Sequence, residues 1–129
     1  MTRHVIQTDQ APKAIGPYSQ GIVANGFVYT AGQGPIVPAT GKIIEGGVEE
    51  QTRQVFANLK AILEAAGTSL EHIVKTTVYL HAITDFQAMN KIYAQFFKDA
   101  PPARTTVGNL ELPMGILVEI EAVATVQGQ

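Results

Sequence analysis

The chain has 129 residues and a mass of 13.8 kDa, which fits one domain over residues 1–129. Hydrophobic residues make up 46% and charged residues only 16%, a composition that excludes a disordered segment. The absence of cysteine excludes disulfides, thiolate nucleophiles and iron–sulfur sites, and the net charge of −2 predicts no nucleic-acid partner. No apolar run reaches the ~20 residues of a membrane span. The N-terminus is too polar for a signal peptide, so we expect a soluble, cytoplasmic protein.

The first half of the chain predicts a hairpin and then a helix. Asn25-Gly26 lies between two apolar runs, the strongest short-range signal for a two-residue hairpin. The stretch from 32 to 47 is rich in glycine and proline and reads as loop, with a short strand at Lys42–Ile44. From Val48 to Ala66 apolar residues recur at helical spacing, and Gly67 follows where a left-handed C-terminal cap belongs.

The second half alternates strand and helix. The β-branched run IVKTTVYL at 73–80 predicts a strand. A second helix is expected to open at Thr84, with Gln87 completing a capping box, and to end before Pro101. Two more strands are expected at about 103–109 and 116–126.

This order predicts an α+β domain in which two helices cover one face of a mixed sheet. In the last strand both alternating faces are partly apolar, yet two helices cover only one of them. An uncovered sheet face in a chain with little charge predicts burial against another copy, and hence an oligomer.

Hydrolytic and phosphate-binding motifs are weak in this sequence. Ser19 has no nucleophile-elbow pattern around it, and the three histidines lack a metal-ligand spacing, so no metal site is expected. The segment Gly32–Pro35 contains G-x-G without the third glycine of a dinucleotide loop. It reads as a tight strand exit, although glycine also allows a ligand to approach the backbone closely.

Three side chains remain as candidates. Glu119 and Glu121 project from one face of a strand, which fits a solvated face or a carboxylate at a pocket rim that performs acid–base work. Arg104 follows two prolines at a strand start, where its planar fork is suited to a carboxylate; the plain alternative is a surface cation near the two glutamates. Tyr18 lies in a turn-rich loop before the hairpin and is either a core lid or a site residue.

The sequence resembles the RidA family, the YjgF-like reactive intermediate imine/enamine deaminases, from about Val5 to Val126. The segments that carry the resemblance are APKAIGPYSQG, TAGQ at 30–33, IVKTTVYL, Met89-Asn90, PPART and VEIEAVA. The resemblance implies a chorismate-mutase-like α+β fold, a homotrimer with intersubunit clefts, and sheets that face an internal barrel.

The resemblance also implies an activity, the hydrolysis of 2-aminoacrylate and related 2-imino acids to 2-oxo acids and ammonia, without metal or cofactor. Arg104 matches the arginine that binds the substrate carboxylate, and Glu119 matches the acid that places and activates water. Tyr18 matches a pocket tyrosine contributed across the interface. Gly32 supplies backbone near the ligand, and Asn90 matches a helix asparagine near the cleft.

Two positions depart from the family pattern. Ala31 stands in place of the serine before the Gly-Gln pair, and Thr106 in place of the cysteine two residues after the arginine. That cysteine position acts through its backbone carbonyl, which Thr106 retains. The loss of a hydroxyl at Ala31 predicts altered efficiency or substrate preference. Ala31 and Thr106 together favour an alternative, a non-catalytic trimer that binds small carboxylates or acts like a chaperone.

Overall fold

The structure is a computed structural model that describes residues 2–126. The elements are β1 (His4–Ile6), β2 (Gly21–Ala24), β3 (Phe27–Thr30), β4 (Ile36–Val37), β5 (Lys42–Ile43), α1 (Val48–Ala65), β6 (Ile73–Leu80), α2 (Phe86–Phe96), β7 (Ala103–Val107) and β8 (Val118–Thr125). Six strands form one sheet in the order β1-β2-β3-β8-β6-β7, and β4 pairs with β5 apart from it. Because β6 and β7 are parallel and the other pairs are antiparallel, the sheet is mixed, as the sequence predicted.

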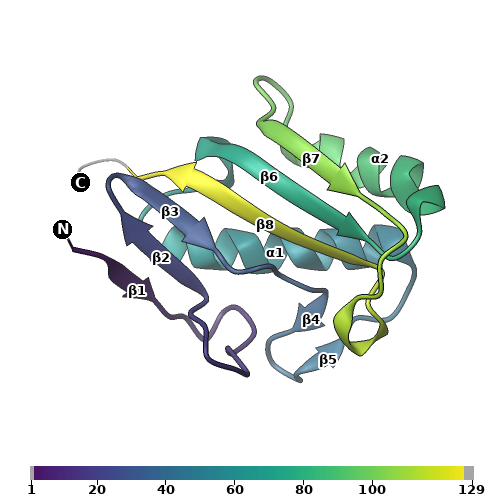
Figure 1. Ribbon diagram of the computed structural model, residues 1–129, viewed down its shortest axis with the longest axis horizontal. Coiled ribbons are helices and arrows are strands. Elements are labelled where there is room, and N and C mark those ends of the chain that lie inside the picture. The colour runs from purple at the N-terminus through teal and green to yellow at the C-terminus, as the bar shows by residue number, and fades with distance from the viewer. Residues whose placement is uncertain (1, 127–129) are drawn as a thin grey trace.

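Both helices lie behind the sheet in Figure 1, and the face toward the viewer carries no helix. The core fills the space between α1, α2 and the inner face of the sheet, with fully buried side chains such as Phe56, Leu59, Met89, Val118 and Ile120. The predicted arrangement, two helices on one face of a mixed sheet, is therefore confirmed. We call the other side of the sheet the open face.

Two local predictions rest on backbone conformations that the structure shows. Asn25 and Gly26 both have positive φ, 53° and 79°, which is the type I′ turn that the Asn-Gly pair favours. Helix α1 ends in a Schellman motif, since Gly67 has φ 86° and its N–H donates to the Glu64 carbonyl at 3.0 Å. The Thr68 N–H completes the motif by donating to the Leu63 carbonyl at 2.9 Å.

The predicted capping box at Thr84 is wrong. Thr84 lies inside a 3-10 turn, Ile83–Asp85, and α2 begins after it with no side-chain cap on Asp85. A tertiary contact fixes this entry instead, because the Ile83 N–H donates to the Asn109 side-chain oxygen at 3.1 Å. The sequence pattern described a local cap, whereas a distant loop supplies the hydrogen bond.

The predicted boundaries of the last two strands were too generous. A 3-10 turn at Pro113–Gly115, with Met114 at φ 63° and Gly115 at φ 73°, delays β8 to Val118. Strand β7 ends at Val107, and Asn109 soon turns the chain with φ 60°. The short strand β1 was not predicted; its three residues form strand only by pairing with β2.

The open face is partly apolar. The strand register shows which of its side chains are neighbours. Val123 of β8 lies between Tyr29 of β3 and Lys75 of β6, and Glu119 of β8 lies opposite Tyr79 of β6. Tyr29 and Val107 are exposed large apolar side chains within the described chain. The oligomer that would cover this face stays a prediction.

Candidate active site

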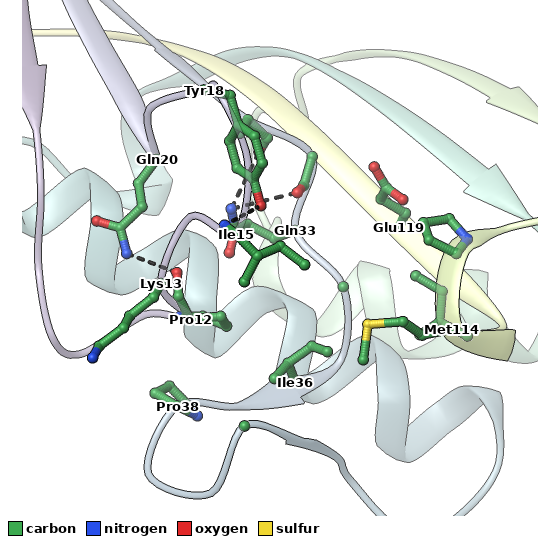
Figure 2. Close-up of a pocket in the computed structure, with 16 residues that line it drawn as sticks. Pro12, Lys13, Ile15, Tyr18, Gln20, Gln33, Ile36, Pro38, Met114 and Glu119 are labelled. Atoms are coloured by element: carbon green, nitrogen blue, oxygen red, sulfur yellow. Dashed lines mark hydrogen bonds between the residues drawn. The ribbon is translucent and has the colours of Figure 1, made fainter.

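A cavity of about 660 Å³ opens beside the start of β8. Its walls come from the loop before β2, the strand exit at 31–34, the β4–β5 segment and the turn at Pro113–Gly115, as Figure 2 shows. Of the residues predicted for the site, Tyr18, Ala31, Gly32 and Glu119 line this cavity together. These four come from distant parts of the sequence, so the fold assembles them.

A break in strand pairing places Gly32 against Glu119. Strand β3 pairs with β8 up to Phe27–Tyr29, and the pairing resumes as an isolated bridge between Gln33 and Ile120. Between these contacts the Ala31 N–H turns away and donates to the Gln20 carbonyl at 2.9 Å. A Cβ on Gly32 would collide with the Glu119 carboxylate, so glycine at this position leaves the space that the carboxylate occupies.

The Glu119 carboxyl is half-buried, and its environment alters its acidity. Burial raises the pKa of Glu119 above its ordinary value near 4.5, and the negative charge of Glu121 raises it further. Glu121 and Tyr79 lie on the same face of the sheet, where burial and then the two glutamates raise the pKa of the Tyr79 hydroxyl. A carboxyl with a raised pKa is suited to exchanging protons nearer neutral pH.

Tyr18 belongs to a loop that one buried glutamine holds in place. Gln20 is 4% exposed; its side-chain oxygen accepts from the Thr8 N–H at 2.7 Å, and its amide donates to the Thr8 and Pro12 carbonyls at 3.0 and 2.8 Å. Within this loop the Ile15 N–H donates to the Tyr18 hydroxyl oxygen at 3.2 Å (Figure 2). The Tyr18 hydroxyl oxygen thus already accepts one hydrogen bond, and the hydroxyl proton can be donated to a ligand.

Two buried amides of α1 anchor the opposite wall. The Asn58 side chain is fully buried and donates to the carbonyls of Gly34 and Ile36 at 3.0 and 2.9 Å. The Gln51 side-chain oxygen accepts from the Leu117 N–H at 2.8 Å. The sequence analysis missed Gln20, Gln51 and Asn58. A signal existed, since Gln51 and Asn58 lie on the apolar stripe of the helix, where an amide without a partner would be costly.

Arg104, Asn90 and Thr106 form a separate group on the helix side of the sheet. Arg104 pairs with the buried Thr76 across β6 and β7, and Thr106 pairs with Val78, so both side chains face α2. The Arg104 Nη1 donates to the Asn90 side-chain oxygen at 2.7 Å. These residues do not line the cavity described above.

Aromatic rings complete the surroundings of Arg104. Its guanidinium carbon lies 4.6 Å from the centre of the Tyr93 ring and 5.4 Å from that of Phe86, distances typical of cation–π contacts. The Tyr93 hydroxyl is 2.7 Å from the Thr76 hydroxyl, and burial raises the pKa of Tyr93. Within residues 2–126 no carboxylate forms a salt bridge with Arg104. Its neighbours fix the side chain in place, and its positive charge is available to bind an anionic ligand.

Arg104 and Glu119 point to opposite sides of the sheet in one chain. Along β6, Arg104 lies beside Thr76 and Glu119 beside Tyr79, about 10 Å apart along the strand. The reading of Arg104 as a surface cation near Glu119 or Glu121 is therefore wrong. Among the described residues that line the cavity, the cation is Lys13, and Figure 2 shows its amino group directed away from Glu119.

Within residues 2–126, no group of three or more histidine, aspartate or glutamate side chains could hold a metal ion. The same residues include no helix that is long and apolar enough to cross a membrane.

Comparisons with known proteins agree with this architecture. Residues 8–126 match the family model described as Endoribonuclease L-PSP. A RutC family protein of Pyrococcus horikoshii is 53% identical over 122 residues, covering 95% of this chain and 97% of the relative. The chloroplastic Reactive Intermediate Deaminase A of Arabidopsis thaliana is 43% identical, over 95% of this chain and 66% of that protein.

Solved structures extend the likeness to three dimensions. The Rid-family protein YyfA of Yersinia pestis superposes with a TM-score of 0.94 at 50% identity, covering 97% of this chain and 100% of that one. TdcF of E. coli, solved with bound serine, superposes with a TM-score of 0.89 at 41% identity, covering 95% and 98%. The fold and site thus define a Rid-type α+β protein. The chain belongs to the YjgF/RidA family, as the sequence motifs indicated.

Proposed function

We propose that this protein hydrolyses reactive 2-imino acids, including the tautomer of 2-aminoacrylate, to 2-oxo acids and ammonia. The observation that carries the proposal is Glu119, a half-buried carboxyl of raised pKa that lies against Gly32 in a cavity shared with Tyr18. In the reaction the oxygen of water bonds to the imine carbon, the C–N bond breaks, and nitrogen leaves as ammonia. The protonated imine is already electrophilic, so positioning and proton transfer suffice.

The proposed site is completed by a second copy of the chain in a chorismate-mutase-like homotrimer with intersubunit clefts. Arg104 faces away from Glu119 within one chain, yet it has the geometry to bind a substrate carboxylate bidentately. The apolar open face supports association, because Tyr29 and Val107 are exposed on it and charge is scarce. A cyclic trimer would repeat one contact three times and bring Arg104 of one copy to Glu119 of the next.

Each site residue then has a proposed role. Arg104, held by Asn90, binds the substrate carboxylate, while Glu119 activates water and transfers protons. Tyr18 donates its hydroxyl proton to the bound substrate from the Glu119 side. The backbone at Gly32 and Ala31 lies close to the ligand, and the Thr106 carbonyl helps place water.

The names of two related proteins support this choice. The Arabidopsis relative is called a reactive intermediate deaminase, and TdcF of E. coli was solved with serine, a small carboxylate. Ala31 and Thr106 favour the alternative of a trimer that binds such carboxylates without turnover. The two are separated by supplying 2-aminoacrylate from a serine dehydratase and following pyruvate. Acceleration over buffer supports the enzyme, whereas binding of 2-oxo acids without acceleration supports the alternative.

Subunit mixing tests whether two chains build one site. Arg104→Ala and Glu119→Gln are each expected to be inactive as pure oligomers. After unfolding together at equal amounts and refolding, each site draws its arginine and its carboxylate from different chains. Both are then intact in about one quarter of sites, and we expect about one quarter of wild-type activity.

The control is the same two proteins refolded separately and then combined, which should stay inactive unless subunits exchange. Mixed oligomers that remain inactive, confirmed as mixed by a mass tag on one chain, would contradict a site shared between chains.

A further inference from the structure

The cavity beside Glu119 has a second, apolar end that the reaction itself does not use. The polar end consists of Glu119, Tyr18 and the backbone at 31–32, and the side chains of Lys13, Gln20 and Gln33 also line the cavity. An apolar part of the lining is formed by Ile36, Pro38, Pro113, Met114 and Ile116. Figure 2 shows the side chains of Met114 and Ile36 directed toward the same space, with Glu119 at its upper margin. The two ends are continuous, so one ligand can contact both.

Part of this apolar end is rigid. Ile116 is 4% exposed, and a Cβ on Gly34 would lie 3.1 Å from its Cδ1, so the side chain packs against the glycine backbone. The Gly34 and Ile36 carbonyls are held by Asn58, and Gln51 holds the backbone next to Ile116. The floor of the cavity therefore keeps its shape without a ligand.

The mouth of the apolar end carries two side chains that expose much apolar surface in a single chain. Met114 is 57% exposed and Ile15 is 82% exposed, and they come from different loops on the cavity wall. Met114 also has φ 63°, a conformation that is unusual for a residue other than glycine, asparagine or aspartate. An exposed apolar residue in a strained backbone conformation at a cavity mouth, such as Met114, is typical of ligand contact.

We infer that this apolar end binds the substrate side chain, and that the preferred substrates are 2-imino acids with a branched aliphatic or thioether side chain. The inference rests on the proposed function and adds the substrate class. With the reacting C=N at Glu119, the methyl of an alanine-derived imine leaves most of the 660 Å³ unfilled, whereas an isobutyl group reaches the apolar wall. A charged side chain among Ile36, Met114 and Ile116 would lose its hydration next to apolar groups. Lys13 also lines the cavity, but Figure 2 shows its amino group directed away from Met114 and Ile36.

The first test compares imines released in situ by an amino-acid oxidase from leucine, alanine and glutamate, with semicarbazide trapping what escapes hydrolysis. Burial of one methylene contributes about four-fold, so we expect kcat/KM for the leucine-derived imine to exceed that for the alanine-derived one by about ten- to sixty-fold. The glutamate-derived imine should be the poorest. Equal values for leucine and alanine would overturn the inference and leave the proposed deaminase intact.

Variants at the mouth sharpen the test. Met114→Gln keeps the side-chain length and, because the residue is exposed, should leave the fold unchanged; Ile15→Gln is the second variant. Each is expected to lower the leucine-to-alanine selectivity about four- to ten-fold. The matched control is Lys60→Gln on the outer surface of α1, which should leave selectivity unchanged. Unchanged selectivity in both mouth variants would overturn the inference.

A binding measurement makes the inference independent of turnover. Calorimetry is expected to give a dissociation constant for 4-methyl-2-oxopentanoate at least about ten-fold below that for pyruvate, with the difference reduced in Met114→Gln. Equal affinities would overturn the inference. If no imine is hydrolysed yet the longer 2-oxo acid binds more tightly, the deaminase proposal fails while the apolar subsite stands.

Discussion

The surroundings of Arg104 and of Glu119 are built in contrasting ways. Arg104 is surrounded by side chains of the core helix α2, two aromatic rings and an amide. Glu119 instead lies against bare backbone at Gly32, in a cavity walled by loops. The cation is thus positioned by packing, and the carboxylate by the close approach of the Gly32 backbone to β8. Changes on the two sides should therefore affect binding, proton transfer and stability differently.

The largest expected effect comes from removing the cation. Arg104→Ala deletes the proposed carboxylate ligand, and loss of a charge-assisted pair predicts a fall in kcat/KM of about 10²–10⁴-fold. Arg104→Lys keeps the charge without the planar fork and should recover only part of the loss. Steady-state kinetics with 2-aminoacrylate measures both, and size-exclusion chromatography checks assembly. Full activity in Arg104→Ala would show that the carboxylate is bound elsewhere.

Substitutions at two glycines are expected to separate an effect on activity from an effect on stability. In Gly32→Ala the new methyl pushes the flexible Glu119 carboxylate aside, so kcat should fall about ten- to one hundred-fold through misplacement, with little change in stability. In Gly108→Ala the new Cβ would lie 2.6 Å from the Ile83 Cβ and 2.8 Å from its Cα. That overpacking should lower the free energy of unfolding by about 1–3 kcal/mol.

Thermal unfolding and kinetics on both glycine variants test the contrast. If Gly32→Ala keeps wild-type kcat, the carboxylate position does not limit the reaction.

The support of Arg104 by Asn90 predicts a smaller effect. Asn90→Ala removes the acceptor that orients the guanidinium, and we expect KM to rise about three- to ten-fold while kcat stays within about two-fold. Tyr93→Phe is the matched control, because it keeps the ring over Arg104 and loses only the hydroxyl contact with Thr76. It should cost stability and leave KM unchanged. A fall in kcat without a change in KM would argue against a positioning role for Asn90.

The smallest predicted effect is a shift in pH dependence. In the proposed reaction Glu119 must be ionised to activate water, so activity should fall as pH drops through its raised pKa, above 4.5. Glu121→Gln removes a neighbouring negative charge, lowers the pKa of Glu119, and should move the midpoint of this acidic limb to lower pH. Rate profiles from pH 4 to 8 test this, and an unmoved midpoint would contradict the coupling.

The same raised pKa has a consequence for stability. The folded chain holds the Glu119 proton more tightly than the unfolded chain does, so this group favours folding below about pH 4.5 and loses that contribution as pH rises through its folded pKa. Glu119→Gln should flatten this part of the curve of unfolding free energy against pH.

The sequence predicted most of the elements because their signals are local. The Asn25-Gly26 turn and the Gly67 cap rest on backbone conformations that few other residues adopt. The errors arose where distant contacts decide, as at Thr84. There the predicted cap is replaced by a hydrogen bond that the Ile83 N–H at the helix entry donates to the Asn109 side-chain oxygen. Local pattern also could not reveal that strand β1 exists only beside β2.

For the candidate site, sequence motifs predicted a set of residues but not their arrangement. Alternation along each strand predicts its two faces, yet only the register between β6, β7 and β8 shows that Arg104 and Glu119 lie on opposite faces. The supporting amides were missed for another reason. A buried amide such as Asn58 looks like a defect in an apolar stripe until its carbonyl partners in a distant loop are known.

Asn58 and Gln51 also attach the cavity wall to α1, a part of the molecule that should open slowly. Both belong to α1, whose inner face is fully buried, so the bonds they make to residues 34, 36 and 117 break only if that helix moves. Local opening of a protein occurs most readily in regions with few buried contacts. The Leu117 amide should therefore exchange its hydrogen with solvent nearly as slowly as the core, whereas the loop that carries Ile15 should exchange early. The wall bonded to α1 should therefore open only when the protein unfolds. The wall that carries Ile15 can move to admit and release a ligand while the rest of the chain stays folded.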